Sequence, residues 1–146
     1  MSANENRLPR FDTFRLVKSE DLNHHGTLFA GRSAEWLVES AFISAAHLVR
    51  PEHIVCVNIH GMHFSKPVNE GDVIKFTSVL VLAGRSSMVA HITLRIQNIA
   101  DPVVEGFISF VHVDEQGTPT PHGQTVTAVT EEDVRLQERA RALPRG

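Results

Sequence analysis

The segment that most constrains the fold of this chain is the loop-to-helix junction formed by residues 23–40. It reads Asn-His-His-Gly-Thr-Leu-Phe-Ala-Gly over residues 23–31 and continues into a helical pattern that ends near Val49. The first backbone N–H groups of a helix lack intrahelical partners and carry the positive end of the helix dipole. Such a junction can hold an anion or polarise a carbonyl oxygen.

The length and charge of the chain exclude several classes of protein. A chain of 146 residues is typical of one domain, so we expect a single domain over residues 1–146. Its net charge of −3 argues against a nucleic-acid partner. The single cysteine, Cys56, lies in an apolar run and is expected to be a small buried hydrophobe. No signal peptide or membrane-spanning run is visible, which predicts a cytoplasmic protein with no membrane partner.

The helical pattern after the junction has a clear apolar face. On a wheel of 100° per residue this face comprises Ala34, Leu37, Val38, Ala41, Ala45 and Leu48. Trp36, Ile43 and His47 fall roughly opposite it. A helix with apolar or aromatic residues on more than one side is usually buried by more than its own sheet, which suggests a partner subunit.

The remaining segments predict strands and one further helix. Extended patterns occupy residues 13–18, 54–64, 73–82, 87–97 and 103–113, and Ile74, Phe76, Leu80 and Leu82 are expected on one strand face. We expect a loose arm over residues 1–10 and a linker over 115–129. Thr130 and an acidic first turn open a helix over residues 130–143. The predicted order along the chain indicates an α+β fold: one strand, a long helix, four strands and a short helix.

Three motifs in this order resemble those of a known family. Residues 23–31 resemble the loop-to-helix signature of the hotdog-fold acyl-CoA thioesterases. Residues 62–68, followed by 71–73 and by Gly-Arg-Ser-Ser at 84–87, resemble the cytosolic acyl-CoA hydrolase branch of that family. The resemblance spans roughly residues 15–113, most of the chain.

The resemblance implies both a fold and an activity. The fold is an antiparallel sheet of about five strands wrapped around one long central helix. The activity is hydrolysis of acyl-CoA to free CoA and a carboxylic acid, with no cofactor beyond the coenzyme A of the substrate. Hotdog subunits pair edge to edge, so we expect a homodimer or larger homo-oligomer with the active site, and an apolar acyl tunnel, at the subunit interface.

The resemblance assigns roles to residues of the junction. The backbone N–H of Ala30, with Gly31 beside it, is expected to polarise the thioester carbonyl; the alternative is that both residues are small only for close packing. Asn23 matches the family's amide, and it either holds water or thioester or forms an Asx-turn. Thr27 is expected to contact substrate. His24 and His25 are alternative bases, or else ordinary surface residues.

The chain departs from the family at its helix acid. The family places Asp or Glu twelve residues after the glycine that matches Gly26, where this chain has Val38. Glu39 follows directly, so either the helix start is rearranged to bring Glu39 into the acidic role, or the usual acid is lost. A solvated Glu39 paired with Arg32 or Arg50 is the simpler alternative, and Glu35 is a weaker candidate acid.

A second group of candidates lies at the turn formed by residues 84–87. Its position matches the one where this branch contacts the nucleotide end of coenzyme A, so Arg85, Ser86 and Ser87 are expected to bind phosphate; an ordinary hairpin turn is the alternative. The scattered histidines show no metal-ligand spacing, and we expect no metal.

Three functions remain after this reading of the sequence. The first is an acyl-CoA thioesterase. The second is a hotdog module that binds acyl-CoA or CoA without hydrolysing it, as the loss of the acid at Val38 would allow. The third is a hotdog dehydratase, whose His-Asp pattern is absent from the chain.

Overall fold

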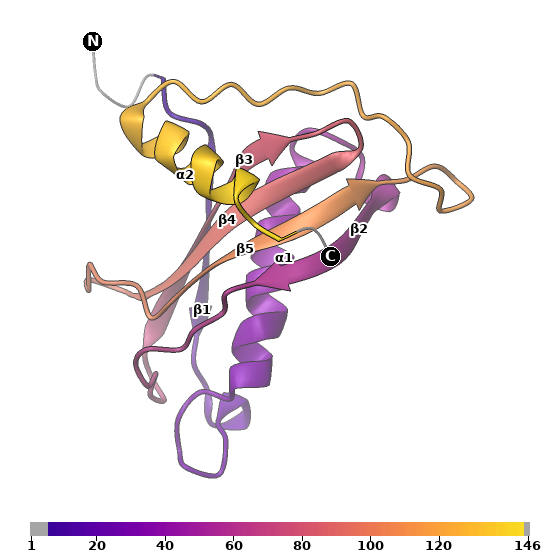
Figure 1. Cartoon of the computed structure of the whole chain (residues 1–146). Helices are drawn as coiled ribbons and strands as arrows, with labels where there is room; N and C mark the ends of the chain where they lie inside the picture. Colours follow the sequence, from indigo (N-terminus) through magenta and orange to yellow (C-terminus); the bar gives the residue numbers. More distant parts are fainter. Residues whose placement is uncertain (1–5, 145–146) are drawn as a thin grey trace.

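A computed structural model describes residues 6–144, and it contains one antiparallel sheet between two helices. The strands are β1 (Arg10–Leu16), β2 (Ile54–His60), β3 (Val73–Ala83), β4 (Ser87–Ile96) and β5 (Val104–His112), in the spatial order β1-β3-β4-β5-β2. The long helix α1 (Ala30–Ala46) packs on one face, and α2 (Glu131–Arg141) lies across the other (Figure 1). Short 3-10 turns occupy Ser19–Asp21 and Pro51–His53. The expected hotdog fold is confirmed.

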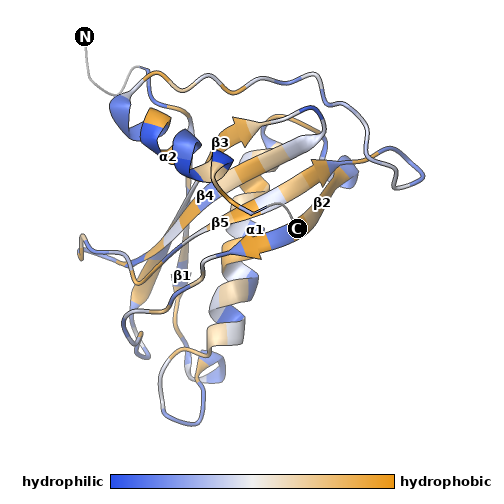
Figure 2. Cartoon of the chain, viewed as in Figure 1, coloured by the Kyte–Doolittle hydropathy of each residue, from blue (hydrophilic) through white to orange (hydrophobic). Residues whose placement is uncertain are grey.

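The inner face of the sheet and α1 enclose the main core. Every second residue of β4 contributes to it, because alternate side chains of a strand point to the same face. Met88, Ala90, Ile92 and Leu94 are all fully buried there. Figure 2 shows the resulting apolar bands on the strands and the mostly hydrophilic surface of α2.

The buried stripe of α1 differs from the predicted apolar face. It contains Leu37, Ala41 and Ala45 as expected, but also three serines, at positions 33, 40 and 44. Two of them are hydrogen-bonded: Ser78 Oγ donates to the Ser40 carbonyl at 2.9 Å, and Ser44 Oγ donates to the Ala41 carbonyl at 2.7 Å. A buried hydroxyl is tolerated when it is hydrogen-bonded, so small polar residues can seat a helix tightly on a sheet.

The sequence predicted Trp36 roughly opposite the buried face of the helix, and this prediction was wrong. Trp36 is only 6% exposed and meets the ring of Phe76 edge-on, with ring centroids 6.2 Å apart. The Arg15 guanidinium lies 5.0 Å from the centroid of the indole ring. The helix sits deeper under β1 than its apolar residues alone indicate, and Trp36 fills the gap between α1 and the sheet. Ile43 is 38% exposed, as its predicted outward position requires.

A β-bulge changes the face of one predicted core residue. The register between β3 and β4 shifts between Leu80 and Leu82. A bulge adds one residue to one strand and so reverses the faces of the residues that follow. Leu80 therefore lies in the inner core, whereas Leu82 packs with the outer cluster, contrary to the expectation that the two share a face.

The helix α2 covers the outer face around this bulge. Leu136 and Ala140 pack against Val79, Val81, Val89 and Phe107 of the sheet. Gln137 Nε2 donates to the carbonyl of Val81, at the bulge, at 2.9 Å. The predicted N-cap is confirmed, because Thr130 Oγ1 accepts a hydrogen bond from the backbone N–H of Asp133 at 3.2 Å.

The N-terminal arm is not loose over its described part. The fully buried carboxylate of Asp133 accepts a hydrogen bond from the Leu8 backbone N–H at 2.7 Å and pairs with the Arg10 guanidinium at 2.6 Å. β1 already begins at Arg10. The arm is therefore held at residues 8–10, while the first five residues lie outside the described part of the chain.

The two edge strands of the sheet expose apolar side chains. On β2, Val55, Val57 and Ile59 are 45%, 53% and 46% exposed, and on β1 Phe14 and Leu16 are 56% and 54% exposed. Cys56 is also exposed, contrary to the expected burial. Among the helices of residues 6–144, none is both long and apolar enough to cross a membrane.

Candidate active site

The start of α1 leaves two backbone donors free. Phe29 is the N-cap residue, and its carbonyl accepts the N–H groups of Arg32 and Ser33 at 3.0 and 3.1 Å. No side chain caps this helix end, and the first turn carries no acidic residue. Within residues 6–144 the N–H groups of Ala30 and Gly31 have no acceptor. These are the donors that a carbonyl oxygen or an anion could use.

The loop before α1 is organised by Asn23. Its Oδ1 accepts the backbone N–H groups of His25 and Thr27 at 2.8 and 3.3 Å, and its Nδ2 donates to Thr27 Oγ1 at 3.1 Å. This is the Asx-turn arrangement that the sequence left open. Because an amide nitrogen carries two hydrogens, the second N–H of Asn23 Nδ2 remains available for a ligand.

This loop is fixed to the segment that follows β2. The Leu28 backbone N–H donates to the Val68 carbonyl at 2.8 Å, and Thr27 forms a bridge with Asn69. Phe29 N–H donates to the carbonyl of Asp21, a residue only 3% exposed whose carboxylate lies 3.6 Å from Arg32 Nε. Asp21 was not singled out in the sequence, since its burial depends on the loop folding back over it.

A hollow of about 310 Å³ opens where these segments meet. Asn23, Thr27, Ala30 and Ser33 line one side, and residues 64–68 with Val103 line the other. Three of the expected junction residues thus share one site. Ser33 was not predicted, although it lies one helical turn after Ala30 and so shares its face. Its hydroxyl has no partner within residues 6–144 and can orient a bound molecule.

Gly31 lies close to the ring of the N-cap residue Phe29. A Cβ atom at this position would lie 2.6 Å from the ring of Phe29. A side chain at this position would require the exposed ring of Phe29 to move. This neighbour belongs to the N-cap residue and not to a strand, so both the helix–strand packing role and the substrate role of Gly31 stay predictions.

Glu39 lies on a different side of α1 from this hollow. It lines a separate hollow of about 250 Å³ together with Thr13, Arg15 and Trp36, and its carboxylate pairs with Arg15 at 3.2 Å. The expected partners were wrong: Arg32 lies beside Asp21 and Arg50 pairs with Glu52, whereas the partner of Glu39 is Arg15 of β1. α1 is continuous from Ala30 to Ala46, so Val38 and Glu39 are consecutive residues of one regular helix. Val38, half-buried, packs against the main core.

The other candidate acids and bases are at the surface. His24 and His25 are both exposed, with ring centroids 3.9 Å apart at the tip of the loop. Glu35 is exposed one turn before Glu39 and makes no ion pair within residues 6–144. None of the three lines the hollow at the start of α1.

The turn at residues 84–87 lies on the outer face, beside a hollow of about 840 Å³. Arg85, Ser86 and Ser87 line it, and β2 contributes Asn58 and His60. The C-terminal end of α2 adds Arg141, which the sequence did not identify, because only the packing of α2 brings it here. Neither Arg85 nor Arg141 has a carboxylate partner among residues 6–144.

The described residues contain no cluster of three or more histidine, cysteine, aspartate or glutamate side chains placed to hold a metal ion. The polar groups that line the two hollows include hydroxyls, the amides of Asn23 and Asn58, the His60 imidazole, the Lys66 ammonium and two arginine side chains.

Comparison with known proteins agrees with this geometry. The model of the thioesterase superfamily matches residues 25–103. An acyl-CoA thioester hydrolase of Bacillus subtilis, YkhA, which is itself uncharacterised, is 30% identical over 124 residues, covering 82% of this chain and 71% of the relative.

Two solved structures share the fold. A hexameric acyl-CoA thioesterase without ligand has a TM-score of 0.80 and 30% identity, covering 91% of this chain and 86% of the other. An acyl-CoA hydrolase from Staphylococcus aureus, solved with butyryl-CoA and CoA, has a TM-score of 0.77 and 26% identity, covering 90% of this chain and 79% of the other.

Proposed function

Because this chain belongs to the thioesterase superfamily, we infer that it is an acyl-CoA thioester hydrolase, which releases free coenzyme A and a carboxylic acid. The observation that carries this conclusion is the uncapped start of α1. The N–H groups of Ala30 and Gly31 have no acceptor within residues 6–144, and Ala30 lines a hollow together with Asn23, Thr27 and Ser33.

The free N–H groups supply the electrostatic part of the reaction. In thioester hydrolysis, negative charge develops on the carbonyl oxygen as water adds to the carbon. Backbone donors at a helix N-terminus stabilise that charge more than they stabilise the neutral carbonyl, which lowers the barrier. The second N–H of Asn23 Nδ2 and the Ser33 hydroxyl orient the thioester or the attacking water.

We propose Glu39 as the acidic group that activates the water, in a site formed by two subunits. Within one subunit Glu39 and Ala30 line separate hollows, so this role requires that the two residues come from neighbouring chains. The exposed apolar edge of β2 supports pairing of subunits through that strand. Hexameric thioesterases with this fold support a closed homo-oligomer.

The outer hollow is proposed to bind the nucleotide end of coenzyme A. The phosphates of that moiety are anionic, and Arg85 and Arg141 are two cations without carboxylate partners within residues 6–144. Guanidinium groups bind phosphate oxygens through paired, charge-assisted hydrogen bonds. We further propose that the protein acts in the cytoplasm, where an exposed thiol such as Cys56 stays reduced.

The test is release of free thiol from a panel of acyl-CoA thioesters of increasing chain length. We expect turnover with at least one of them, and a large loss of kcat in Asn23→Ala. Binding of acyl-CoA without release of thiol, for every chain length, would replace hydrolysis by the non-hydrolytic binding function.

A further inference from the structure

The backbone of the turn at residues 84–87 is held from outside the β3–β4 hairpin. The carbonyls of Arg85, Ser86 and Ser87 all accept hydrogen bonds from residues beyond this hairpin. The Ser86 carbonyl accepts the backbone N–H of His112 at 2.7 Å. The other two carbonyls accept from a single residue, His122, which lies in the extended segment between β5 and α2.

His122 contacts the turn through both its backbone and its ring. Its backbone N–H donates to the Arg85 carbonyl at 3.2 Å, and its ring Nε2 lies 3.0 Å from the Ser87 carbonyl oxygen. Ring Nδ1 accepts the backbone N–H of Gln124 at 2.9 Å. A carbonyl only accepts, so Nε2 carries the hydrogen, and Nδ1 must then be unprotonated. These partners select the neutral Nε2–H tautomer.

The side chains of the turn are not held in the way that its backbone carbonyls are. Within residues 6–144, Arg85 has no ion-pair partner, and the hydroxyls of Ser86 and Ser87 make no hydrogen bond. All three line the outer hollow. The backbone is therefore fixed while the side chains that face the hollow remain free, as expected for a preorganised binding loop.

The ring of His122 is not needed to attach its own segment. That segment is already joined to β5 by the bridge between Val113 and Pro119 and by the Thr120 N–H, which donates to the His112 carbonyl at 2.9 Å. The turn also has internal order, since Gly84 N–H donates to the Ser87 carbonyl at 2.9 Å. The Nε2 bond thus adds an external constraint to a carbonyl that already closes the turn.

We propose that His122 is a positioning residue for the nucleotide end of coenzyme A, holding the Arg85–Ser87 turn in its binding geometry through the Nε2–H bond to the Ser87 carbonyl. The inference rests on the proposed binding of CoA at this hollow. It assigns to the segment between β5 and α2 a role in substrate affinity rather than only a connecting one.

The experiment compares three variants on two substrates. His122→Gln keeps a donor near the Nε2 position, His122→Asn keeps only the acceptor near Nδ1, and His122→Leu removes both. The substrates are an acyl-CoA that the protein hydrolyses and the corresponding acyl-pantetheine thioester, which lacks the nucleotide. His53→Leu is the matched control, since His53 Nδ1 also bonds a backbone carbonyl, that of Val113 at 2.9 Å, but within residues 6–144 it makes no hydrogen bond to the turn.

We expect the KM for acyl-CoA to rise about three- to tenfold in the Leu and Asn variants, the effect of one hydrogen bond. The kcat should stay unchanged, the Gln variant should restore KM, and acyl-pantetheine should show no difference between any variant and the wild type. Equal losses on both substrates, or equal losses in His53→Leu, would show a merely structural role and overturn the inference.

Calorimetric titration with CoA separates this inference from the proposed hydrolysis. If the wild type binds CoA but releases no thiol, hydrolysis fails, and the same order of affinities, with wild type and Gln tighter than Asn and Leu, still supports the role of His122. If the wild type does not bind CoA, or if all four proteins bind it equally, the inference fails.

Discussion

Replacing Glu39 by glutamine tests the proposal that this carboxylate activates the attacking water. The substitution keeps the size of the side chain but removes its charge and its capacity to accept a proton. The ion pair that it breaks joins side chains that are 60% and 42% exposed, Glu39 and Arg15. Such surface pairs contribute about 0–1 kcal/mol, so the free energy of unfolding should change by less than that.

The effect on catalysis should be much larger than the effect on stability. Loss of a general base lowers kcat by on the order of 10²-fold or more, which corresponds to about 2.7 kcal/mol in the barrier. The measurement is thiol release at saturating acyl-CoA, together with CoA affinity, which should be nearly unchanged. Glu35→Gln is the matched control, because it removes an exposed carboxylate one turn away on the same helix.

The two-subunit site adds a stricter requirement. If Glu39 and Asn23 of one site come from different chains, mixed oligomers of Glu39→Gln and Asn23→Ala should regain activity that neither variant has alone. Near-normal turnover in Glu39→Gln would refute the role of Glu39 and leave His24 and His25 as the next candidates. Loss of activity without any complementation would refute the shared site.

Four further outcomes are expected. Arg85→Ala should weaken CoA binding by about 1–3 kcal/mol in calorimetry, whereas Arg50→Ala, at a residue that does not line the hollow, should not; unchanged affinity in Arg85→Ala would reject the phosphate contact. Light scattering at micromolar concentration should give a mass well above the 16.2 kDa of one chain, and a monomer would contradict subunit pairing. Burial alone would raise the pKa of Asp133, but Arg10 and the Leu8 N–H lower it more, to a net value below its ordinary range. Its contribution to stability is therefore present at neutral pH and lost as the pH falls below about 4. Asp133→Asn should abolish this acid-dependent step and cost about 3–5 kcal/mol in denaturant unfolding at pH 7, and an unchanged pH profile would count against the pairing. Burial lowers the pKa of His91 despite its contact with Glu105 at 3.1 Å, so stability should decline as the pH falls from about 6.5, and His91→Gln should flatten that decline.

The sequence predicted the elements of the fold well because their periodicity is local. The alternation of Ala90, Ile92 and Leu94 with His91 and Thr93 is enough to define a strand and its buried face. The order of strands in the sheet and the position of α2 depend on contacts between distant residues, which no local pattern contains. The bulge that moves Leu82 to the outer face is equally invisible in the spacing of apolar residues.

The candidate site was predicted in part for the same reason. Asn23, Thr27 and Ala30 lie in one short loop, so they come together as soon as α1 begins at the predicted place. Glu39 does not join them, because one residue along a helix turns a side chain by about 100°. Ser33 and Arg141 were missed, since the first reads as an ordinary helix residue and the second reaches its hollow only through the packing of α2.

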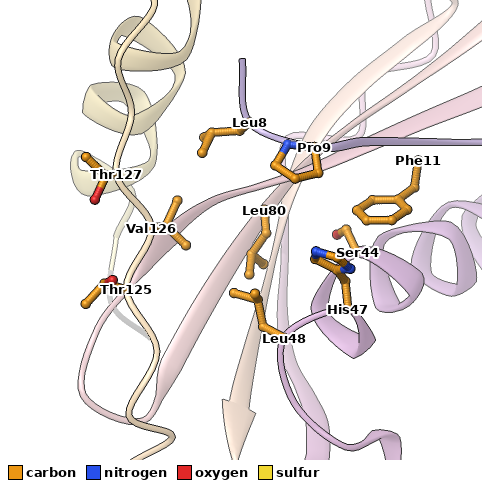
Figure 3. A pocket seen from close by; sticks show the side chains of 10 residues that line it. All are labelled: Leu8, Pro9, Phe11, Ser44, His47, Leu48, Leu80, Thr125, Val126 and Thr127. Carbon is orange, nitrogen blue, oxygen red and sulfur yellow. The ribbon is translucent and has the colours of Figure 1, made fainter. Parts of the chain in front are cut away.

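A small cavity beneath the segment between β5 and α2 shows how closely the far end of α1 is enclosed. It has a volume of about 110 Å³ and lies between His47 and Leu48, which follow α1, Leu80 of β3 and Val126 (Figure 3). It lies near the C-terminal end of α1, whereas the proposed reaction takes place at the N-terminal end. The helix is thus enclosed at this end by side chains from three other parts of the chain.

The hydrogen bonds of the buried Ser40 fix the position of α1 on the sheet. An apolar stripe alone would tolerate small sliding or rotation, because hydrophobic contact has no direction. The hydrogen bonds of Ser40 with Ser78 and with Thr13, at 2.9 and 3.2 Å, can both form only at one position of the helix along the sheet. The same position determines where the free N–H groups of Ala30 and Gly31 lie relative to residues 64–68. The alignment of the reacting groups therefore depends on hydroxyls roughly 15 Å away along the helix axis, at 1.5 Å per residue.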